Sequence, residues 1–179
     1  IGKLEVKPKK MNIDIPTLCY LKKLNRNASC RMCLVEIKGN NKLVTSCSTR
    51  VAEGMEVYTD TDRLKLARVK NLELILSSHN KTCFSCTRNN SCKLKDLFNE
   101  YDIEENTKLP KVQREAKVDD SSAYLVRDNS KCILCGRCVS VCKNVQGVAV
   151  IDKNNRGIET NIGCAFDMDI KDVPCIACG

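Results

Sequence analysis

The chain has 179 residues, of which 4% are aromatic and none is tryptophan. So few large apolar side chains allow only a thin hydrophobic core, in one medium domain or in two to three small ones. The formal net charge is +8, but the basic residues are scattered and are not interleaved with aromatic residues, which argues against nucleic-acid binding. The sequence shows no secretory leader pattern and no apolar run long enough to cross a bilayer.

Fourteen cysteines are the most informative feature of the composition. Such a density is typical either of a secreted disulfide scaffold or of a metal-rich intracellular protein. The tight C-x2-C spacings favour metal, because neighbouring cysteines in such runs are poorly placed for disulfides with one another. We therefore expect a protein of the reducing cytoplasm.

Residues 1–60 predict a small β-rich domain around four cysteines. Alternating apolar residues suggest a strand at Leu4–Val6, and strand-like residues 34–37 and 43–45 flank a turn at 39–41. The cysteines have x10, x2 and x13 spacings and are Cys19, Cys30, Cys33 and Cys47. Three ligands on one loop and a fourth beyond a hairpin suit a 2Fe-2S cluster, although the plant-type loop has x4 in place of x10. A zinc ribbon is the alternative, which the unequal loops fit poorly.

Only 18 residues precede Cys19. A domain of this kind needs a full hairpin and usually a helix before its cluster loop. We therefore expect that residues are missing near Pro8 to Lys10.

From Thr61 to Ser78 the apolar pattern becomes helical, and the helix leads to the one histidine of the chain. A lone histidine is usually a surface or capped core residue. Here three cysteines follow it, in the order His79, Cys83, Cys86 and Cys92 with the spacing H-x3-C-x2-C-x5-C. Imidazole and thiolate both bind iron and zinc, so the spacing leaves both metals open.

A short amphipathic helix is predicted from Leu94 to Tyr101. Residues 102–120 are charged, contain Pro110 and show no sustained period, which predicts an extended surface linker and a domain boundary. A short strand is predicted over residues 123–126.

The last third of the chain carries a ferredoxin motif with x2, x2 and x3 spacings, formed by Cys132, Cys135, Cys138 and Cys142. In two-cluster bacterial ferredoxins the first three cysteines bind one 4Fe-4S cluster and the fourth binds the other cluster. A strand at residues 148–151 and a turn at residues 154–157 are predicted next.

The chain ends on Cys175 and Cys178, which open a second C-x2-C motif. Together with Cys142 they give the second cluster three ligands. We expect the fourth ligand of each cubane beyond Gly179. Cys164 is expected to be a small buried residue, with replacement of a missing ligand as the alternative.

Three stretches carry a resemblance to a known family. They are IPTLCY…SCRMCLVEI…LVTSCST, the motif that starts at His79, and CILCGRC with the sequence that follows it to AFDMDIKDVPCIACG. They resemble the N-terminal iron–sulfur region of FeFe hydrogenase large subunits. The large iron–sulfur subunit of complex I and NAD-dependent formate dehydrogenases share this region, but the module at 132–179 resembles the FeFe hydrogenases most closely.

The resemblance implies an α+β protein with three parts. These are a β-grasp 2Fe-2S ferredoxin domain (1–60), a small helical 4Fe-4S domain with its linker (61–120), and a truncated bacterial-ferredoxin-like domain with two 4Fe-4S clusters (121–179). The implied cofactors are one 2Fe-2S cluster and three 4Fe-4S clusters, one of them held by one His and three Cys. The implied ligands are Cys19, Cys30, Cys33, Cys47, His79, Cys83, Cys86, Cys92, Cys132, Cys135, Cys138, Cys142, Cys175 and Cys178.

The resemblance also implies the function: an electron relay of a multi-subunit FeFe hydrogenase linked to NAD(H) or ferredoxin, with electron bifurcation as one possible mode. The residues present contain no catalytic site, so the hydrogen-activating site is expected elsewhere. The implied partners are flavin/NAD-binding and ferredoxin-like iron–sulfur subunits and a soluble ferredoxin, without a membrane span. The alternatives are the same relay in a formate dehydrogenase or complex I-like enzyme and, from a different class, a zinc-binding interaction module.

Overall fold

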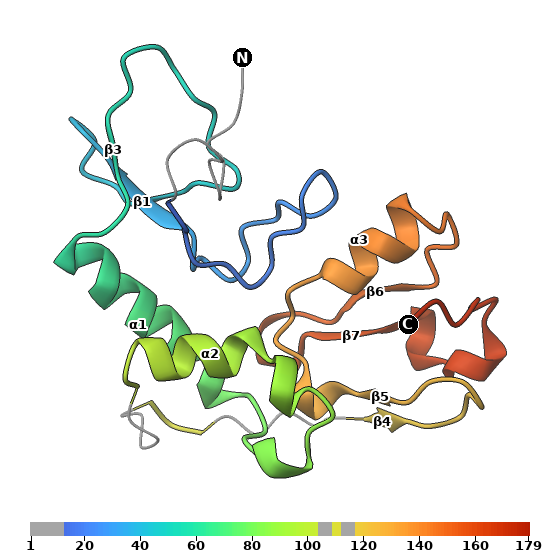
Figure 1. Cartoon of the computed structure of the whole chain (residues 1–179). Helices are drawn as coiled ribbons and strands as arrows, with labels where there is room; N and C mark the ends of the chain where they lie inside the picture. The colour runs from blue at the N-terminus through green and yellow to red at the C-terminus, as the bar shows by residue number, and fades with distance from the viewer. Residues whose placement is uncertain (1–12, 104–108, 112–116) are drawn as a thin grey trace.

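The computed structural model describes residues 13–103, 109–111 and 117–179. Figure 1 shows the described elements, with a small sheet and two helices in the first half and a third helix with two strand pairs in the second half. The strand predicted at Leu4–Val6 and the gap expected near Pro8 to Lys10 lie outside the described residues.

The sheet of the first half has the order β2-β1-β3, with antiparallel pairing throughout. Its strands are β1 (Leu34–Ile37), β2 (Val44–Thr45) and β3 (Val57–Tyr58). The predicted hairpin is confirmed: Leu34 pairs with Thr45 and Val35 with Val44. Gly39 has a φ of +80° in the turn between them, a conformation that costs a glycine little.

Helix α1 (Asp62–Ser77) confirms the helix predicted from Thr61 to Ser78. The Thr61 side chain caps it by accepting a hydrogen bond from the Leu64 backbone N–H at 3.2 Å, which satisfies one of the free donors of the first turn. The buried residues of α1 are four apart, as one face of a helix requires, and are Leu64, Arg68, Leu72 and Leu76. One of these four is charged.

Helix α2 (Lys93–Glu100) confirms the second predicted helix. Its buried Leu94 and Leu97 share a core cluster with Leu72 and Leu76 of α1, so the two helices pack together (Figure 1). The larger core cluster also contains Cys19 and Cys30. A second cluster gathers around β1, with Ile15, Cys33, Val35 and Cys47.

The second half contains a helix between two antiparallel strand pairs. Strand β4 (Val118–Asp119) pairs with β5 (Arg127–Asp128), and β6 (Ile151–Asn154) pairs with β7 (Asn161–Cys164). Helix α3 (Arg137–Asn144) packs against β6 (Figure 1). Six short 3-10 helices are found in the described residues: Cys83–Ser85, Asn89–Ser91, Asn129–Lys131, Gly157–Glu159, Ala165–Asp167 and Ile170–Asp172.

Two predicted strands do not form where they were expected. The strand expected at 148–151 begins only at Ile151, because the backbone N–H groups of Val148 and Ala149 both donate to the Cys142 carbonyl and close the end of α3. The strand expected at 123–126 is wrong: Tyr124 and Val126 are exposed, and the ladder forms instead at Arg127–Asp128.

Within the three described ranges, none of the helices combines the length and the apolar character that crossing a bilayer requires.

Candidate iron–sulfur sites

The four cysteines predicted to bind the 2Fe-2S cluster are all buried, and they interact as two pairs, Cys19 with Cys30 and Cys33 with Cys47. The Cys19 backbone N–H donates to Cys30 Sγ at 3.4 Å. A hydrogen bond from the Cys30 thiol holds the pKa of Cys19 well below its usual value, and one from the Cys47 thiol does the same for Cys33. Two close sulfur pairs fit a 2Fe-2S cluster, in which four cysteines are shared by two irons.

The buried guanidinium of Arg68 fixes the backbone of this loop from α1. It donates to the carbonyl oxygens of Met32 (Nε, 3.2 Å), Leu34 (Nη2, 2.8 Å) and Thr59 (Nη2, 2.9 Å). Met32 and Leu34 are the neighbours of Cys33 in the sequence, so Arg68 places a buried positive charge beside a predicted ligand. A thiolate-bound cluster is negatively charged, and the donor set and the local charge of this site both fit one.

The predicted His79 site follows α1 along one loop. His79 comes directly after Ser78, the C-cap of α1, and Cys92 is the last residue before α2. Cys83 lies in a 3-10 turn, whose end is closed by a hydrogen bond from the Cys86 N–H to the Cys83 carbonyl at 3.1 Å. The three cysteines are half-buried, so this part of the chain is more open than the 2Fe-2S loop.

The two C-x2-C turns of the second half share one local geometry. Leu134 and Ala177 each precede the second cysteine of their turn and have φ values of 54° and 49°. Each donates its backbone N–H to the sulfur of the first cysteine: Leu134 to Cys132 at 3.4 Å and Ala177 to Cys175 at 3.5 Å. N–H groups that point at sulfur stabilise a thiolate and tune a bound cluster.

Burial acts on the remaining cysteines of the second half. It raises the pKa of Cys135 and of Cys138; the thiol of Cys138 adds to the shift of Cys135, and that of Cys132 adds to the shift of Cys138. Cys142 is buried in α3. Cys164 is 3% exposed in β7, as expected of a small buried residue, and burial raises the pKa of its thiol.

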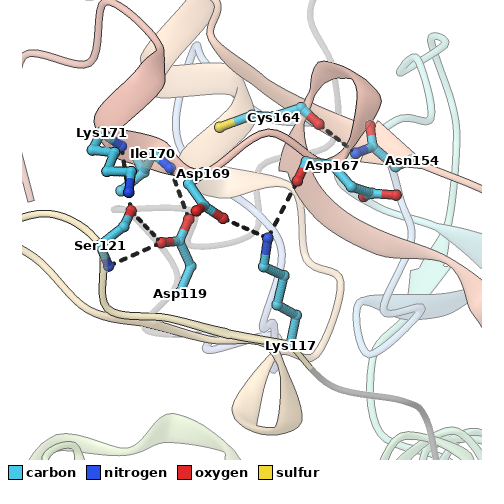
Figure 2. A network of polar contacts seen from close by, with 9 residues as sticks. All are labelled: Lys117, Asp119, Ser121, Asn154, Cys164, Asp167, Asp169, Ile170 and Lys171. Carbon is cyan, nitrogen blue, oxygen red and sulfur yellow. Dashed lines mark hydrogen bonds and ion pairs between the residues drawn. The ribbon is translucent and has the colours of Figure 1, made fainter.

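A network of polar contacts anchors the segment that leads to Cys175 (Figure 2). The Asp119 carboxylate in β4 accepts hydrogen bonds from the Ile170 N–H at 2.9 Å and from the Ser121 hydroxyl at 2.6 Å. Lys117 Nζ forms an ion pair with Asp169 at 2.6 Å. Strand β4 therefore fixes residues 169–170, only a few residues before the last two cysteines.

All fourteen cysteines are described, and none forms a disulfide. In the described ranges, no group of three or more His, Cys, Asp or Glu side chains is close enough to hold a single metal ion.

Three polar residues that support these sites were missed by the sequence analysis: Arg68, Asn25 and Asp119. The burial of Arg68 could have been predicted from the sequence, because it lies four residues from Leu64 and four from Leu72 on the buried face of α1. The roles of Asn25 and Asp119 could not have been predicted in this way, since their hydrogen-bond partners lie up to 115 and 51 residues away in the sequence.

Three family models match the chain in succession. They are a 2Fe-2S iron-sulfur cluster binding domain (residues 9–62), the NADH-ubiquinone oxidoreductase-G iron-sulfur binding region (residues 68–107), and a 4Fe-4S binding domain (residues 125–145). The chain therefore contains 2Fe-2S and 4Fe-4S binding regions.

Similar curated proteins come from hydrogenases and from complex I. The chain is 39% identical over 176 residues to the NADP-reducing hydrogenase subunit HndD of Solidesulfovibrio fructosivorans, covering 96% of this chain and 30% of that protein. It is 36% identical to iron hydrogenase 1 of Clostridium pasteurianum, covering 82% of this chain and 26% of that protein. It is 35% identical to a G-type subunit of the NADH-quinone oxidoreductase of Rhizobium meliloti, covering 86% of this chain and 18% of that protein. The chain thus spans less than a third of the length of each of these relatives.

A solved structure agrees with this assignment. The crystal structure of an NAD+-reducing [NiFe]-hydrogenase in the H2-reduced state matches with a TM-score of 0.83 and 26% sequence identity, covering 91% of this chain and 68% of that chain. The chain is an iron–sulfur region related to the G-type subunit of NADH-quinone oxidoreductases and to hydrogenase subunits such as HndD and iron hydrogenase 1.

Proposed function

We propose that this chain is the electron relay of a multi-subunit FeFe hydrogenase. It would pass electrons between a hydrogen-activating site outside these residues and a partner that handles NAD(H) or ferredoxin. The observation that carries the proposal is the pairing of four buried cysteines, three on one loop and the fourth beyond the β1–β2 hairpin, followed along the chain by a His/Cys motif and two C-x2-C turns of matching geometry. The similarity to HndD and to iron hydrogenase 1 supports the hydrogenase assignment.

The proposed cofactors are one 2Fe-2S cluster and three 4Fe-4S clusters, which would supply one-electron carriers when bound. The 2Fe-2S cluster is assigned to the two sulfur pairs of the first domain (1–60), with ligands Cys19, Cys30, Cys33 and Cys47. The second domain (61–120) would hold a 4Fe-4S cluster through His79, Cys83, Cys86 and Cys92. The third (121–179) would hold two more, through Cys132, Cys135, Cys138, Cys142, Cys175 and Cys178 with further ligands beyond Gly179.

The chain's own contribution is to hold and tune these ligands. Backbone N–H groups donate to Cys30, Cys132 and Cys175, which favours the thiolate over the thiol. The α1 and α2 helices exclude water from the 2Fe-2S loop, since Cys19 and Cys30 lie in their shared core.

The proposed setting is the cytoplasm, in a complex with flavin/NAD-binding and ferredoxin-like iron–sulfur subunits and with a soluble ferredoxin as a further partner. A second candidate is the same relay in a complex I-like oxidoreductase, which the similarity to the Rhizobium meliloti protein supports. A formate dehydrogenase relay is the third variant of the same function. The catalytic domain that accompanies this region distinguishes the three.

Metal analysis of the full-length gene product, purified without oxygen, tests the proposal. We expect a brown protein with about fourteen irons and matching sulfide from this region, the sum of one 2Fe-2S and three 4Fe-4S clusters. A colourless protein loaded with zinc would establish the zinc-binding module instead.

Cys33→Ser should abolish the EPR signal of the 2Fe-2S cluster. Cys164→Ser is the matched control, because Cys164 is also buried, at 3% exposed, and lies outside every proposed ligand set; it should leave the iron content unchanged.

A further inference from the structure

The side chain of Asn25 joins two loops that are far apart in the sequence. Its amide Nδ2 donates to the backbone carbonyl of Cys19 at 2.8 Å and to that of Cys135 at 2.9 Å. Its Oδ1 accepts a hydrogen bond from the Ser140 hydroxyl of α3 at 3.1 Å. Cys19 belongs to the predicted 2Fe-2S loop and Cys135 to the predicted ferredoxin motif, so one buried amide touches both sites.

The surroundings hold this amide in one orientation. Asn25 is 3% exposed, and its backbone N–H and carbonyl are both paired with Leu21 across a tight turn. An asparagine amide offers two N–H donors on one nitrogen and an acceptor oxygen, and all three roles are used here. Aspartate has no donor, serine has one, and leucine has none, so the arrangement specifies an amide of this length.

We propose that Asn25 is a positioning residue that holds the Cys19 and Cys135 loops at a fixed separation. It would thereby set the rate of electron transfer between a cluster bound at the Cys19 site and a cluster bound at the Cys135 site. The inference rests on the proposed function. It goes beyond it because it assigns the contact between two stations of the relay to one side chain that ligates no metal. The rate of electron tunnelling falls steeply with the distance between donor and acceptor, so a small increase in the separation of the two loops slows the transfer.

The neighbouring Asn27 provides a natural comparison. Its Nδ2 donates to the same Cys135 carbonyl at 3.2 Å, but it is exposed and has no hydrogen bond to Cys19 among those of the described residues. Loss of the Asn27 amide therefore removes this donor and the acceptor of the Ser29 N–H and hydroxyl, but it leaves the Asn25 link between the two loops in place. Ser140 is the complementary case, because its hydroxyl orients the Asn25 amide from α3 while Asn25 itself stays in place.

The experiment compares Asn25→Asp and Asn25→Leu with Asn27→Ala in the full-length, anaerobically purified gene product with its clusters bound. Iron and sulfide content establish loading. The enhancement of the electron-spin relaxation of the 2Fe-2S cluster by the reduced cubane reports their separation, and rapid reduction with an artificial donor reports the transfer rate. Both Asn25 variants should keep their iron, show a weaker relaxation enhancement and transfer electrons severalfold more slowly, because without the shared amide donors the two loops can move apart. Asn27→Ala should stay within about twofold of the wild type, because Asn25 keeps both of its hydrogen bonds to the two loops in this variant.

The outcomes separate the positioning role from the relay itself. If the Asn25 variants hold iron and show wild-type relaxation and rates, the positioning role is overturned while the relay stands. If they lose iron, Ser140→Ala decides: a weaker coupling with full iron supports the role, and unchanged coupling overturns it. Asn25→Gln should recover part of the coupling, because it keeps both donors. A wild-type protein without a 2Fe-2S signal would instead overturn the proposed function.

Discussion

Arg68 Nε donates a hydrogen bond to the backbone carbonyl of Met32 at 3.2 Å, from a guanidinium that is 3% exposed. Its Nη2 reaches the carbonyls of Leu34 and Thr59, and no ion pair found in the described residues includes it. A buried charge is costly unless it is well hydrogen-bonded. The Arg68 charge lies beside Cys33, is hydrogen-bonded to backbone carbonyls and is not neutralised by any of these ion pairs. It therefore favours the reduced form of a cluster bound there, because that form is the more negative one.

We predict that Arg68→Met lowers the reduction potential of the 2Fe-2S cluster. The change should be on the order of 60 mV, which corresponds to a tenfold change in the ratio of oxidised to reduced cluster for one electron. Arg68→Lys keeps the charge and loses part of the hydrogen bonding, so it should restore most of the potential. A redox titration followed by EPR measures both. Equal potentials in the Met and Lys variants would show that Arg68 acts through loop geometry and not through its charge.

Arg68 also illustrates what the sequence could and could not predict. Local patterns predicted the β1–β2 hairpin and both helices of the first half correctly, because apolar spacing and turn residues decide them. The strand predicted at 148–151 failed, since the N–H groups of Val148 and Ala149 bind the Cys142 carbonyl at the end of α3. The spacing of the cysteines indicated the sites, but the polar residues that support them depend on contacts between distant segments.

Gly136→Ala should destabilise the ferredoxin motif more than Gly147→Ala, although both glycines have the same left-handed backbone conformation. Gly136 precedes α3 with a φ of 69°, and a Cβ there would lie 2.8 Å from Asn27 Nδ2. Gly147 follows α3 with a φ of 71° and has nothing within 4 Å of its Cβ position. Both substitutions incur a strain of about 1–2 kcal/mol for the left-handed conformation. Gly136→Ala should lose about 1 kcal/mol more if Asn27 gives up its hydrogen bond to Cys135.

The midpoint of guanidinium-induced loss of cluster absorbance, measured without oxygen, compares the two glycine variants. Equal midpoints would mean that Asn27 moves aside without cost.

Asp119→Asn should weaken the attachment of the segment before Cys175. Burial alone would raise the pKa of Asp119, but hydrogen bonds from the Ser121 hydroxyl and from the Ile170 and Ser121 N–H groups outweigh it, with Lys117 nearby, and the pKa lies below its usual value. An amide would turn an N–H group toward one of these donors, at a cost of about 1–3 kcal/mol. Asp167→Asn is the control, because Lys117 hydrogen-bonds the backbone carbonyl of that residue, which the substitution keeps.

The pH dependence of the Asp119 effect follows from the direction of its pKa. A carboxylate with a lowered pKa contributes its full stability above the ordinary value of about 4 and loses it only as the pH falls through the lower, folded-state value. The difference in thermal stability between the wild type and Asp119→Asn should therefore stay constant from pH 6 to 8, a range chosen well above about 4. A difference that shrinks steadily toward pH 6 would indicate a raised pKa and contradict the hydrogen-bonding account.

His79→Cys should lower the potential of the cluster proposed for the second domain while iron content stays the same. A thiolate in place of a neutral imidazole makes the cluster more negative and harder to reduce, as the comparison of Rieske with plant-type centres indicates, and the change should be on the order of 100 mV. Thr87→Cys is the matched control, because it adds a cysteine to the same loop at an exposed position outside the proposed ligand set. EPR-monitored redox titration of both variants checks the direction. Loss of about four irons in His79→Cys, with Thr87→Cys fully loaded, would show that the imidazole is required for assembly and that its effect on potential is secondary.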